Sequence, residues 1–389
     1  MAVYFIFIFF TTVLDCSAQT DKLTIKTGAE RFDVYLPEIK DKKIGLVVNN
    51  TSIVEQEHLV DFLLRQKIDI VRIFAPEHGY RGEAAAGEKI DDGNDQTTGI
   101  QVISLYGELR KPTPEQLIGL DVVVFDIQDV GCRFYTYIST LHFVIEACAE
   151  NNIPLIILDR PNPNGDYVAG PVLKPEFRSF VGMDPIPVVH GCTVGELARM
   201  INGELWTKAL TKCNLTVIPV LNYTHLTSYR LPVKPSPNLP DYLSVRLYPS
   251  LCFFEATSIS VGRGTEFPFQ VLGGLNPEFG NFQFTPFDMP GIVMNPLHEG
   301  QTCFGIDLRN LTEIPIFTLK FFLDFYRKFE KIEYFVTNEN WLNLLAGTDE
   351  ILKQIKDGKT EHEIEQSWQP ELTRYKNIRK KYLLYPDFE

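Results

Sequence analysis

The hydrophobic pattern changes a little beyond the middle of the chain. From residue 43 to about residue 219, short runs of β-branched and other apolar residues alternate with amphipathic stretches. These runs have the length and composition of buried strands, which we predict at 44–48, 68–74, 102–105, 122–125, 155–158 and 215–219. Apolar residues at helical spacing predict helices over 58–66 and 137–151. Strands that alternate with helices indicate βαβ units and an α/β fold with a mainly parallel sheet.

The rest of the chain has a different pattern. After residue 219, loops rich in proline and aromatic residues dominate, and helical patterns return at 317–326 and in the charged stretch beyond residue 347. We place a domain boundary near 222–234. The prediction is an α/β domain over 19–225 and a smaller α+β domain over 226–389 that completes the cleft.

The first residues are predicted to be a targeting segment. Residues 4–14 form an apolar run too short to span a bilayer, and the small residues after it fit cleavage behind Ala18. The usual basic start of a signal is missing, because no Lys or Arg precedes Lys22. A lipoprotein anchored through Cys16 is the alternative, but the charged Asp15 before it argues against this. We expect a signal peptide over 1–18 and a secreted or periplasmic protein without a membrane span.

Composition limits the class of ligand. The chain has 389 residues, with 37 Lys and Arg against 50 Asp and Glu, for a formal net charge of −13. An acidic protein repels polyanions, which argues against nucleic acid as a partner. Aromatic residues make up 12% of the chain. Most such side chains belong to cores, and the remainder weakly favour a small or carbohydrate-like ligand.

Polar residues follow three of the predicted strands. Glu77 and His78 come after 68–74, Asp126 and Asp129 after 122–125, and Asp159 after 155–158. The carboxyl ends of parallel strands meet at one rim of the sheet, where ligands bind. Two carboxylates a few ångströms apart can act as a general acid and its partner in splitting an acetal, a close pair favouring retention and a wider pair inversion. The sequence therefore predicts a glycoside-cleaving site at this rim.

Each candidate also has a structural interpretation. Asp126 and Asp159 could instead form Asx turns or cap helices. Glu77 has no apolar run directly after it, which favours catalysis over a position in the first turn of a helix. His78 could be a general base or could only bond the loop. The polar segment 75–99 is long enough to be a functional loop.

Other motifs argue against a metal or a cofactor. The segment 191–195 imitates a nucleophile elbow, but Thr193 and Glu196 have the spacing of a capping box that opens a helix. Segment 262–264 lacks the third glycine of a dinucleotide fingerprint, and the chain has no Walker A motif, no H-E-x-x-H and no metal spacing among its histidines. The six cysteines after the signal lack zinc spacing, so we expect buried free thiols, with disulfides as the alternative.

Several motifs together carry a resemblance to one family. They are APEHG at 75–79, SLYG at 104–107, FDIQDVG at 125–131 followed by RFYTY at 133–137, DRPNP at 159–163, PSPNLP at 235–240 and SVGRGT at 260–265. In this order they resemble the exo-β-N-acetylmuramidases of the NamZ type, once a domain of unknown function. The match runs from about residue 44 to beyond 265, and more loosely to the C-terminus. Cys132 and Ala256 depart from the family, which often has alanine and glycine there.

The resemblance implies both a fold and an activity. The fold is a Rossmann-like N-terminal domain, with helices on both faces of its sheet, and a smaller C-terminal domain that leaves a cleft between the two. The activity is removal of N-acetylmuramic acid from the non-reducing ends of peptidoglycan fragments. A non-catalytic muropeptide-binding protein on the same scaffold is the alternative, and turnover would distinguish it. A nucleotide-dependent enzyme is disfavoured because a phosphate loop is missing.

That reaction suggests roles for the candidates. A glycosidic oxygen is a poor leaving group and must be protonated, and Glu77 is the candidate acid, with His78 as a further catalytic candidate. Asp126 or Asp129 would orient the 2-acetamido group of the sugar, which can itself attack the anomeric carbon. The lactyl carboxylate of muramic acid needs a cation, for which arginine is suited. The substrate-binding candidates are Arg133, Arg160 and Arg263 for this carboxylate, and Asn162, Tyr106 and Tyr135 for the sugar.

Overall fold

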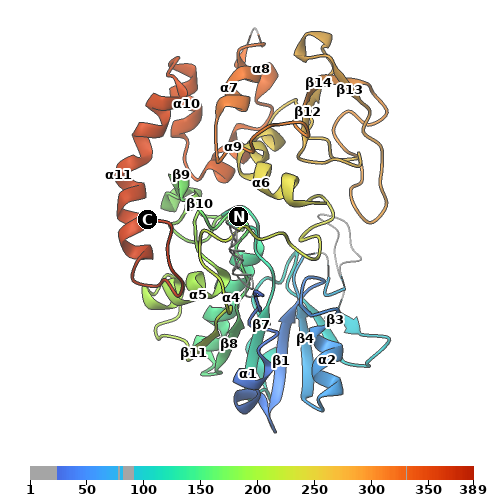
Figure 1. Cartoon of the computed structure of the whole chain (residues 1–389), viewed down its shortest axis with the longest axis vertical. Coiled ribbons are helices and arrows are strands. Elements are labelled where there is room, and N and C mark those ends of the chain that lie inside the picture. The colour runs from blue at the N-terminus through green and yellow to red at the C-terminus, as the bar shows by residue number, and fades with distance from the viewer. Residues whose placement is uncertain (1–23, 78, 82–91, 330) are drawn as a thin grey trace, which may run out of the picture.

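A seven-stranded sheet lies at the centre of the N-terminal half of the molecule (Figure 1). The computed structural model describes residues 24–77, 79–81, 92–329 and 331–389, so the predicted signal peptide and His78 lie outside the described residues. In sheet order the strands are β11 (Leu215–Ile218), β8 (Leu155–Leu158), β7 (Val122–Asp126), β1 (Lys43–Val48), β4 (Asp69–Ala75), β6 (Gln101–Ser104) and β5 (Gly93–Asn94). All neighbours pair in parallel except the edge strand β5, which is antiparallel to β6.

The parallel strands follow the order of a doubly wound sheet. Numbered along the chain, they run 3-2-1-4-5-6 across the sheet. The chain builds one half of the sheet outward from β1 and then returns to build the other half, so the order reverses between β1 and β7. Ligands of such sheets bind outside the carboxyl ends of the strands at this switch point.

Helices cover both faces of the sheet. Alternate residues of β1 point to opposite faces, so that Leu46 and Val48 belong to one apolar cluster and Val47 to another. The first cluster includes residues of α1 (Phe32–Ile39) and α2 (Leu59–Arg65); the second includes residues of α3 (Pro114–Leu117), α4 (Tyr137–Glu150) and α5 (Val194–Gly203). The predicted α/β fold with helices on both faces is confirmed.

The local predictions for this half also hold. Each of the six predicted strands and both predicted helices forms, with ends within one residue of those expected. At the start of α5, the Thr193 hydroxyl accepts from the Glu196 amide at 3.2 Å, and the Glu196 carboxylate accepts from the Thr193 amide at 2.9 Å. This is the capping box, so Thr193 is a helix cap and not a nucleophile.

The C-terminal region combines a small antiparallel sheet with helices. The strands β12 (Val271–Gly274), β14 (Cys303–Asp307) and β13 (Phe282–Phe284) pair in this order. The helices are α6 (Tyr242–Leu251), α7 (Lys320–Tyr326), α8 (Ile332–Phe335), α9 (Glu339–Ala346), α10 (Glu350–Lys356) and α11 (Glu361–Arg379), with the 3-10 turns η2 (Cys252–Ala256) and η3 (Pro277–Phe279). The remaining short elements are β2 (Ile53–Val54), β3 (Glu57–His58), β9 (Ala169–Val172), η1 (Pro175–Phe177) and β10 (Pro187–Val189).

One apolar core joins the two halves. It extends from Phe125 on the sheet through Phe253 of η2 to Tyr375 of α11. Figure 1 shows α11 running along one side of the molecule from the C-terminal region toward the sheet, and the guanidinium of its fully buried Arg379 donates to the main-chain oxygen of Gly191 at 2.7 and 2.9 Å. Shared packing therefore fixes the C-terminal region over the strand ends. The division at residues 225 and 226 stays a prediction.

The described residues also show the state of the cysteines and whether any helix could span a membrane. The six cysteines after the predicted signal are all buried and free, as expected. Burial raises the pKa of the Cys192 thiol to about 12, so it stays protonated at neutral pH. Within the described ranges, no helix is long and apolar enough to cross a membrane.

Candidate active site

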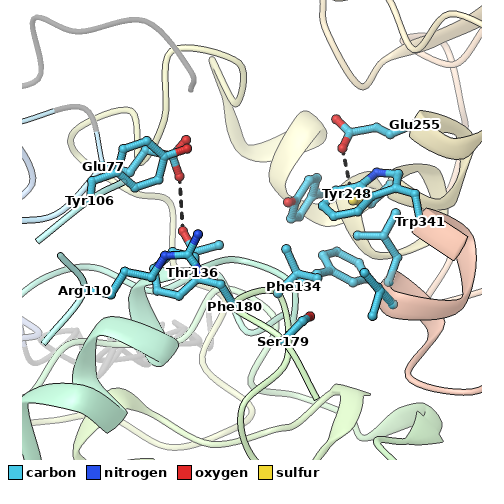
Figure 2. A pocket seen from close by; sticks show the side chains of 14 residues that line it. Glu77, Tyr106, Arg110, Phe134, Thr136, Ser179, Phe180, Tyr248, Glu255 and Trp341 are labelled. Atoms are coloured by element: carbon cyan, nitrogen blue, oxygen red, sulfur yellow. Dashed lines mark hydrogen bonds between the residues drawn. The ribbon is translucent and has the colours of Figure 1, made fainter. Parts of the chain in front are cut away.

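A pocket of about 460 Å³ lies where the strand ends meet the C-terminal region (Figure 2). Its sheet side is formed by residues of the loops that follow β4, β6 and β7, and by the segment between β9 and β10. Its other side comes from α6, η2 and α9. The residues that line it are Glu77, Tyr106, Arg110, Phe134, Thr136, Ser179, Phe180, Val181, Tyr248, Cys252, Glu255, Trp341, Leu344 and Leu345. Aromatic walls with a few polar groups are typical of sites that bind sugars or other small ligands.

Glu77 stands at the sheet side of this pocket. It follows β4 by two residues, and the Thr136 hydroxyl donates to its carboxylate at 3.2 Å. The Tyr137 hydroxyl donates to its main-chain oxygen at 3.4 Å, which holds the loop against the start of α4. The Tyr106 hydroxyl also bonds to Glu77, and burial together with the Glu77 charge raises the pKa of Tyr106. Glu77 is therefore held in the pocket by hydroxyl groups.

Glu255 faces the same pocket from the C-terminal side. It lies on η2, and the guanidinium of Arg263 donates to its carboxylate at 2.5 and 2.8 Å. The side chains of Glu255 and Arg263 are 21% and 28% exposed, and Glu255 itself lines the pocket. Figure 2 shows Glu255 with Tyr248 and Trp341 across the pocket from Glu77 and Tyr106. Two carboxylates thus line one pocket from opposite sides.

Sequence reasoning missed Glu255. The carboxylates predicted from the sequence all follow predicted strands, whereas Glu255 lies on η2, directly after α6 and outside the parallel sheet. One signal was present, because its partner Arg263 belongs to the 260–265 motif. The buried cluster of α6 and η2, which includes Leu251 and Phe253, gives this turn its fixed position.

A smaller cavity of about 80 Å³ opens beside Glu77. The residues it shares with the larger pocket include Glu77, Thr136 and Tyr248, and those it adds include Tyr135 and Arg263. The Tyr135 hydroxyl donates to the main-chain oxygen of Pro235 at 2.5 Å, which ties the 133–137 and 235–240 motifs together. Glu77, Tyr106, Tyr135 and Arg263 are therefore the predicted site residues that the structure brings together.

Asp126 and Arg160 lie outside the pocket. Their side chains are 0% and 2% exposed and form a bidentate ion pair, with nitrogen–oxygen distances of 2.6 and 2.8 Å. Arg160 also donates to the main-chain oxygen of Ile53 at 3.0 Å. A carboxylate and a guanidinium that saturate each other inside the protein bind the ends of β7 and β8 together. The pair is thus placed to hold the scaffold rather than to contact a sugar.

Asp129 and Asn162 are also buried in the loops. Asp129 accepts from the Gly131 amide at 2.6 Å and bonds to the His190 ring at 3.2 Å. Asn162 donates to the main-chain oxygen of Cys192 at 2.8 Å. A Cβ atom on Gly131, whose φ is +82°, would come within 2.4 Å of the Asn162 side chain. The glycine lets the loops after β7 and β8 pack directly on each other.

Arg133 and Asp159 have internal partners as well. The fully buried Arg133 donates to the main-chain oxygens of Pro171, Ile186 and Leu345 at 2.8 to 2.9 Å, which ties the loop after β7 to α9. Asp159 accepts from the Thr193 hydroxyl and the Gly195 amide, both at 2.7 Å, at the start of α5. Asp159 therefore has a structural role at the start of α5, beside the N-cap Thr193.

The polar groups of the described residues suit acid–base chemistry. The part of the chain that the structure describes contains no cluster of three or more His, Cys, Asp or Glu side chains able to hold a metal ion. His78, a catalytic candidate, falls outside the described residues. A pocket with two carboxylates on opposite walls and aromatic side chains between them can hold a sugar ring and act on it from two sides.

Comparison with known proteins decides the family. The model described as "Exo-beta-N-acetylmuramidase NamZ, N-terminal" matches residues 44–243, and "Exo-beta-N-acetylmuramidase NamZ, C-terminal" matches residues 246–385. The chain belongs to the NamZ exo-β-N-acetylmuramidase family. This membership makes it a glycosidase, and the two matches meet in the region where the doubly wound half gives way to α6.

Relatives of the NamZ family match almost the whole chain. The peptidoglycan beta-N-acetylmuramidase NamZ of Bacillus subtilis (strain 168) is 37% identical over an alignment of 411 positions that covers 97% of each protein. Two crystal structures of DUF1343 family proteins from Bacteroides fragilis NCTC 9343 are also similar. One is 43% identical with a TM-score of 0.86, over 94% of this chain and 99% of that one. The other is 28% identical with a TM-score of 0.79, over 93% and 99%.

Proposed function

We propose that this NamZ-family protein is an exo-β-N-acetylmuramidase that releases N-acetylmuramic acid from the non-reducing ends of peptidoglycan fragments. Family membership and the name of the Bacillus relative support this substrate. The observation that carries the proposal is the pocket in which Glu77 and Glu255 face each other among aromatic side chains. We assign the protonation of the leaving group to Glu77 and an orienting role to Glu255.

The surroundings of the two carboxylates support this division. Glu255 is ion-paired with Arg263, so it can accept a hydrogen bond or stabilise positive charge. Glu77 is bonded by hydroxyls of Thr136 and Tyr106, and a hydroxyl can donate to a carboxylate or accept from a carboxylic acid. Glu77 can therefore be hydrogen-bonded in both protonation states of a general acid.

The sugar's own 2-acetamido group is our candidate nucleophile. Its carbonyl oxygen attacks the anomeric carbon while Glu77 gives its proton to the glycosidic oxygen and the glycosidic bond breaks. The cyclic oxazolinium so formed carries positive charge, which the Glu255 carboxylate would stabilise. Water then attacks the anomeric carbon, Glu77 takes the proton back, and the acetamide is restored. Two displacements at one carbon give net retention.

Hydrolysis of a chromogenic β-N-acetylmuramide tests the function. We expect turnover of the muramide at a kcat/KM roughly 10² to 10⁴ times that of the matched β-N-acetylglucosaminide, because a charged subsite for the lactyl group stays empty with the latter. Binding of the muramide without product would instead support a non-catalytic protein. Equal rates for both sugars would contradict a site built for muramic acid.

Proton NMR of the first-formed product tests the nucleophile. Acetamido participation predicts that a β-linked substrate first gives β-N-acetylmuramic acid, read before mutarotation. Initial α-anomer would show inversion and overturn participation. If β-anomer forms, a thioacetamido analogue that stalls only the participating route separates the acetamide from a protein carboxylate as nucleophile.

We also propose that the protein is exported and cleaved after Ala18. The apolar run over 4–14 and the small residues before Gln19 support this. Expression of the full chain in a secreting host should yield a mature protein whose N-terminal sequence begins at Gln19. A product that keeps residues 1–18 would contradict the proposal.

A further inference from the structure

A second pocket adjoins the one that holds Glu77 and Glu255. It has a volume of about 300 Å³ and shares Arg110, Ser179 and Phe180 with the first pocket. The guanidinium of Arg110 lies 4.3 Å from the centre of the Phe180 ring, and Figure 2 shows both on the Thr136 side of the first pocket. A substrate seated beside Glu77 can thus reach the second pocket past these side chains.

Positive charge dominates the lining of the second pocket. Arg110, Arg178 and Lys208 all line it, and all three are exposed. Arg110 donates to the main-chain oxygen of Gly107 at 3.2 Å, and Arg178 donates to the His142 ring at 3.2 Å. Within the described residues, none of the three cations forms an ion pair with a carboxylate. Their charges therefore remain open to a ligand.

The acidic groups nearby already have partners. Glu146 also lines the pocket, but its side chain is only 4% exposed and it pairs with Lys111 at 2.8 Å. Although burial opposes its ionisation, hydrogen bonds from Lys111 and from the Lys208 amide lower the pKa of Glu146. Asp184 is bonded to the other ring nitrogen of His142 at 2.8 Å. These buried contacts fix His142, which in turn holds the guanidinium of Arg178 toward the pocket.

We propose that this second pocket is a carboxylate-binding subsite of the active site, in which Arg110 and Arg178 grip an acidic substituent of the substrate. The proposal rests on the muramidase function proposed above. An arginine side chain can bind a carboxylate through two parallel hydrogen bonds. Arg110 lines both pockets, so it connects the subsite to the pocket of Glu77. Arg133 and Arg160 are buried with internal partners, and Arg263 is paired with Glu255, so these sequence candidates are already engaged.

Two different carboxylates of the substrate could occupy this subsite. The carboxylate can be the lactyl group of the muramic residue that is released, or a carboxylate on the leaving side, on a later muramic residue or its peptide. Both bind an arginine fork in the same way, so the pocket chemistry alone does not separate them. Substrates in which a single carboxylate is amidated separate them directly.

The test compares Arg110→Gln and Arg178→Gln with the wild type on matched acid and amide substrates. Arg374→Gln on α11 is the control, because Arg374 is 69% exposed and lines neither pocket. We expect the wild type to prefer the acid over its amide by about tenfold or more in kcat/KM, and each subsite variant to lose most of that preference. Each subsite variant should lose more kcat/KM on the acid than on the amide. The preference should also shrink with added salt.

Two substrate pairs identify the carboxylate. An aryl β-N-acetylmuramide and its lactyl amide carry no saccharide on the leaving side, so an effect there assigns the subsite to the released residue. If the variants lose the preference for the acid only with a tetrasaccharide and its leaving-side amide, the subsite binds a carboxylate of the leaving group. Variants that slow acid and amide equally on both pairs, or change neither, would overturn the proposal. A wild type that hydrolyses no muramide would refute the proposed function instead.

Discussion

The loop after β4 and the loops after β7 and β8 begin alike but end in different surroundings. All leave the carboxyl ends of parallel strands of the same sheet, and all carry carboxylates within a few residues. Glu77 lines a pocket, whereas Asp126 is fully buried against Arg160. A carboxylate at a strand end can thus serve chemistry or hold the loops that surround the chemistry. The position along the strand does not decide between catalysis and structural support. Solvent access and the partner of the carboxylate decide it.

The largest expected effect is on stability, and it comes from breaking the buried ion pair between Asp126 and Arg160. Arg160→Met leaves the carboxylate of Asp126 buried without its partner, which costs about 3 to 5 kcal/mol of unfolding free energy. Urea unfolding at neutral pH measures this. The double variant with Asp126→Leu should recover much of the loss, because the uncompensated charge is gone. If Arg160→Met unfolds like the wild type but loses activity, Arg160 belongs with the pocket.

Substitution of Glu77 should lower activity and leave stability almost unchanged. Glu77→Gln removes the proton donor but keeps the size of the side chain, so kcat on a disaccharide should fall by about 10² or more while the urea midpoint hardly changes. Steady-state kinetics and unfolding on the same preparation measure both. Near-wild-type kcat in the folded variant would remove Glu77 from the mechanism.

Asp159 should give a pH-dependent effect on stability. Burial raises its pKa to about 6, although donors such as the Tyr385 hydroxyl oppose the shift. In the unfolded chain the pKa is about 4. Between about pH 4 and about pH 6, Asp159 holds a proton in the native state that it has released in the unfolded state. The bound proton therefore contributes fully to the free energy of unfolding below about pH 4, and this contribution is lost as the pH rises through about 6.

The size of this contribution is at most about 3 kcal/mol. Asp159→Asn cannot titrate, so the gap in unfolding free energy between wild type and variant should narrow as the pH rises from 4 to 6. Urea unfolding at several pH values gives this gap. A gap that stays constant or widens would mean that the hydrogen-bond donors keep Asp159 ionised in the native state.

The smallest effect is expected at the aromatic wall. Trp341→Ala removes a ring that lines the pocket and also packs against the core, so we expect KM for the muramide to rise about threefold to tenfold together with some loss of stability. Tyr334→Ala is the control, because this ring is 57% exposed and lies on α8 outside the pocket. Equal KM changes in both variants would argue against contact between Trp341 and the sugar.

The sequence predicted the sheet more fully than the site. Strands buried on both faces are continuous apolar runs, so 155–158 was located to the residue and the capping box at Thr193 marked the start of α5. The site depends on contacts distant in sequence. Thr136 meets Glu77 across 59 positions, and Glu255 reaches the same pocket from the C-terminal region. Burial of Arg133 depends on three separate carbonyl oxygens, which no local pattern indicates.

The dependence on the leaving group tests the role of Glu77 most directly. Kinetics of wild type and Glu77→Gln would be compared on a β-linked disaccharide and on 2,4-dinitrophenyl β-N-acetylmuramide, whose phenolate leaves without protonation. If Glu77 protonates the glycosidic oxygen, the deficit of about 10² or more on the disaccharide should shrink to less than about tenfold on the aryl glycoside. Equal deficits on the two substrates would contradict the assignment of Glu77 as the general acid.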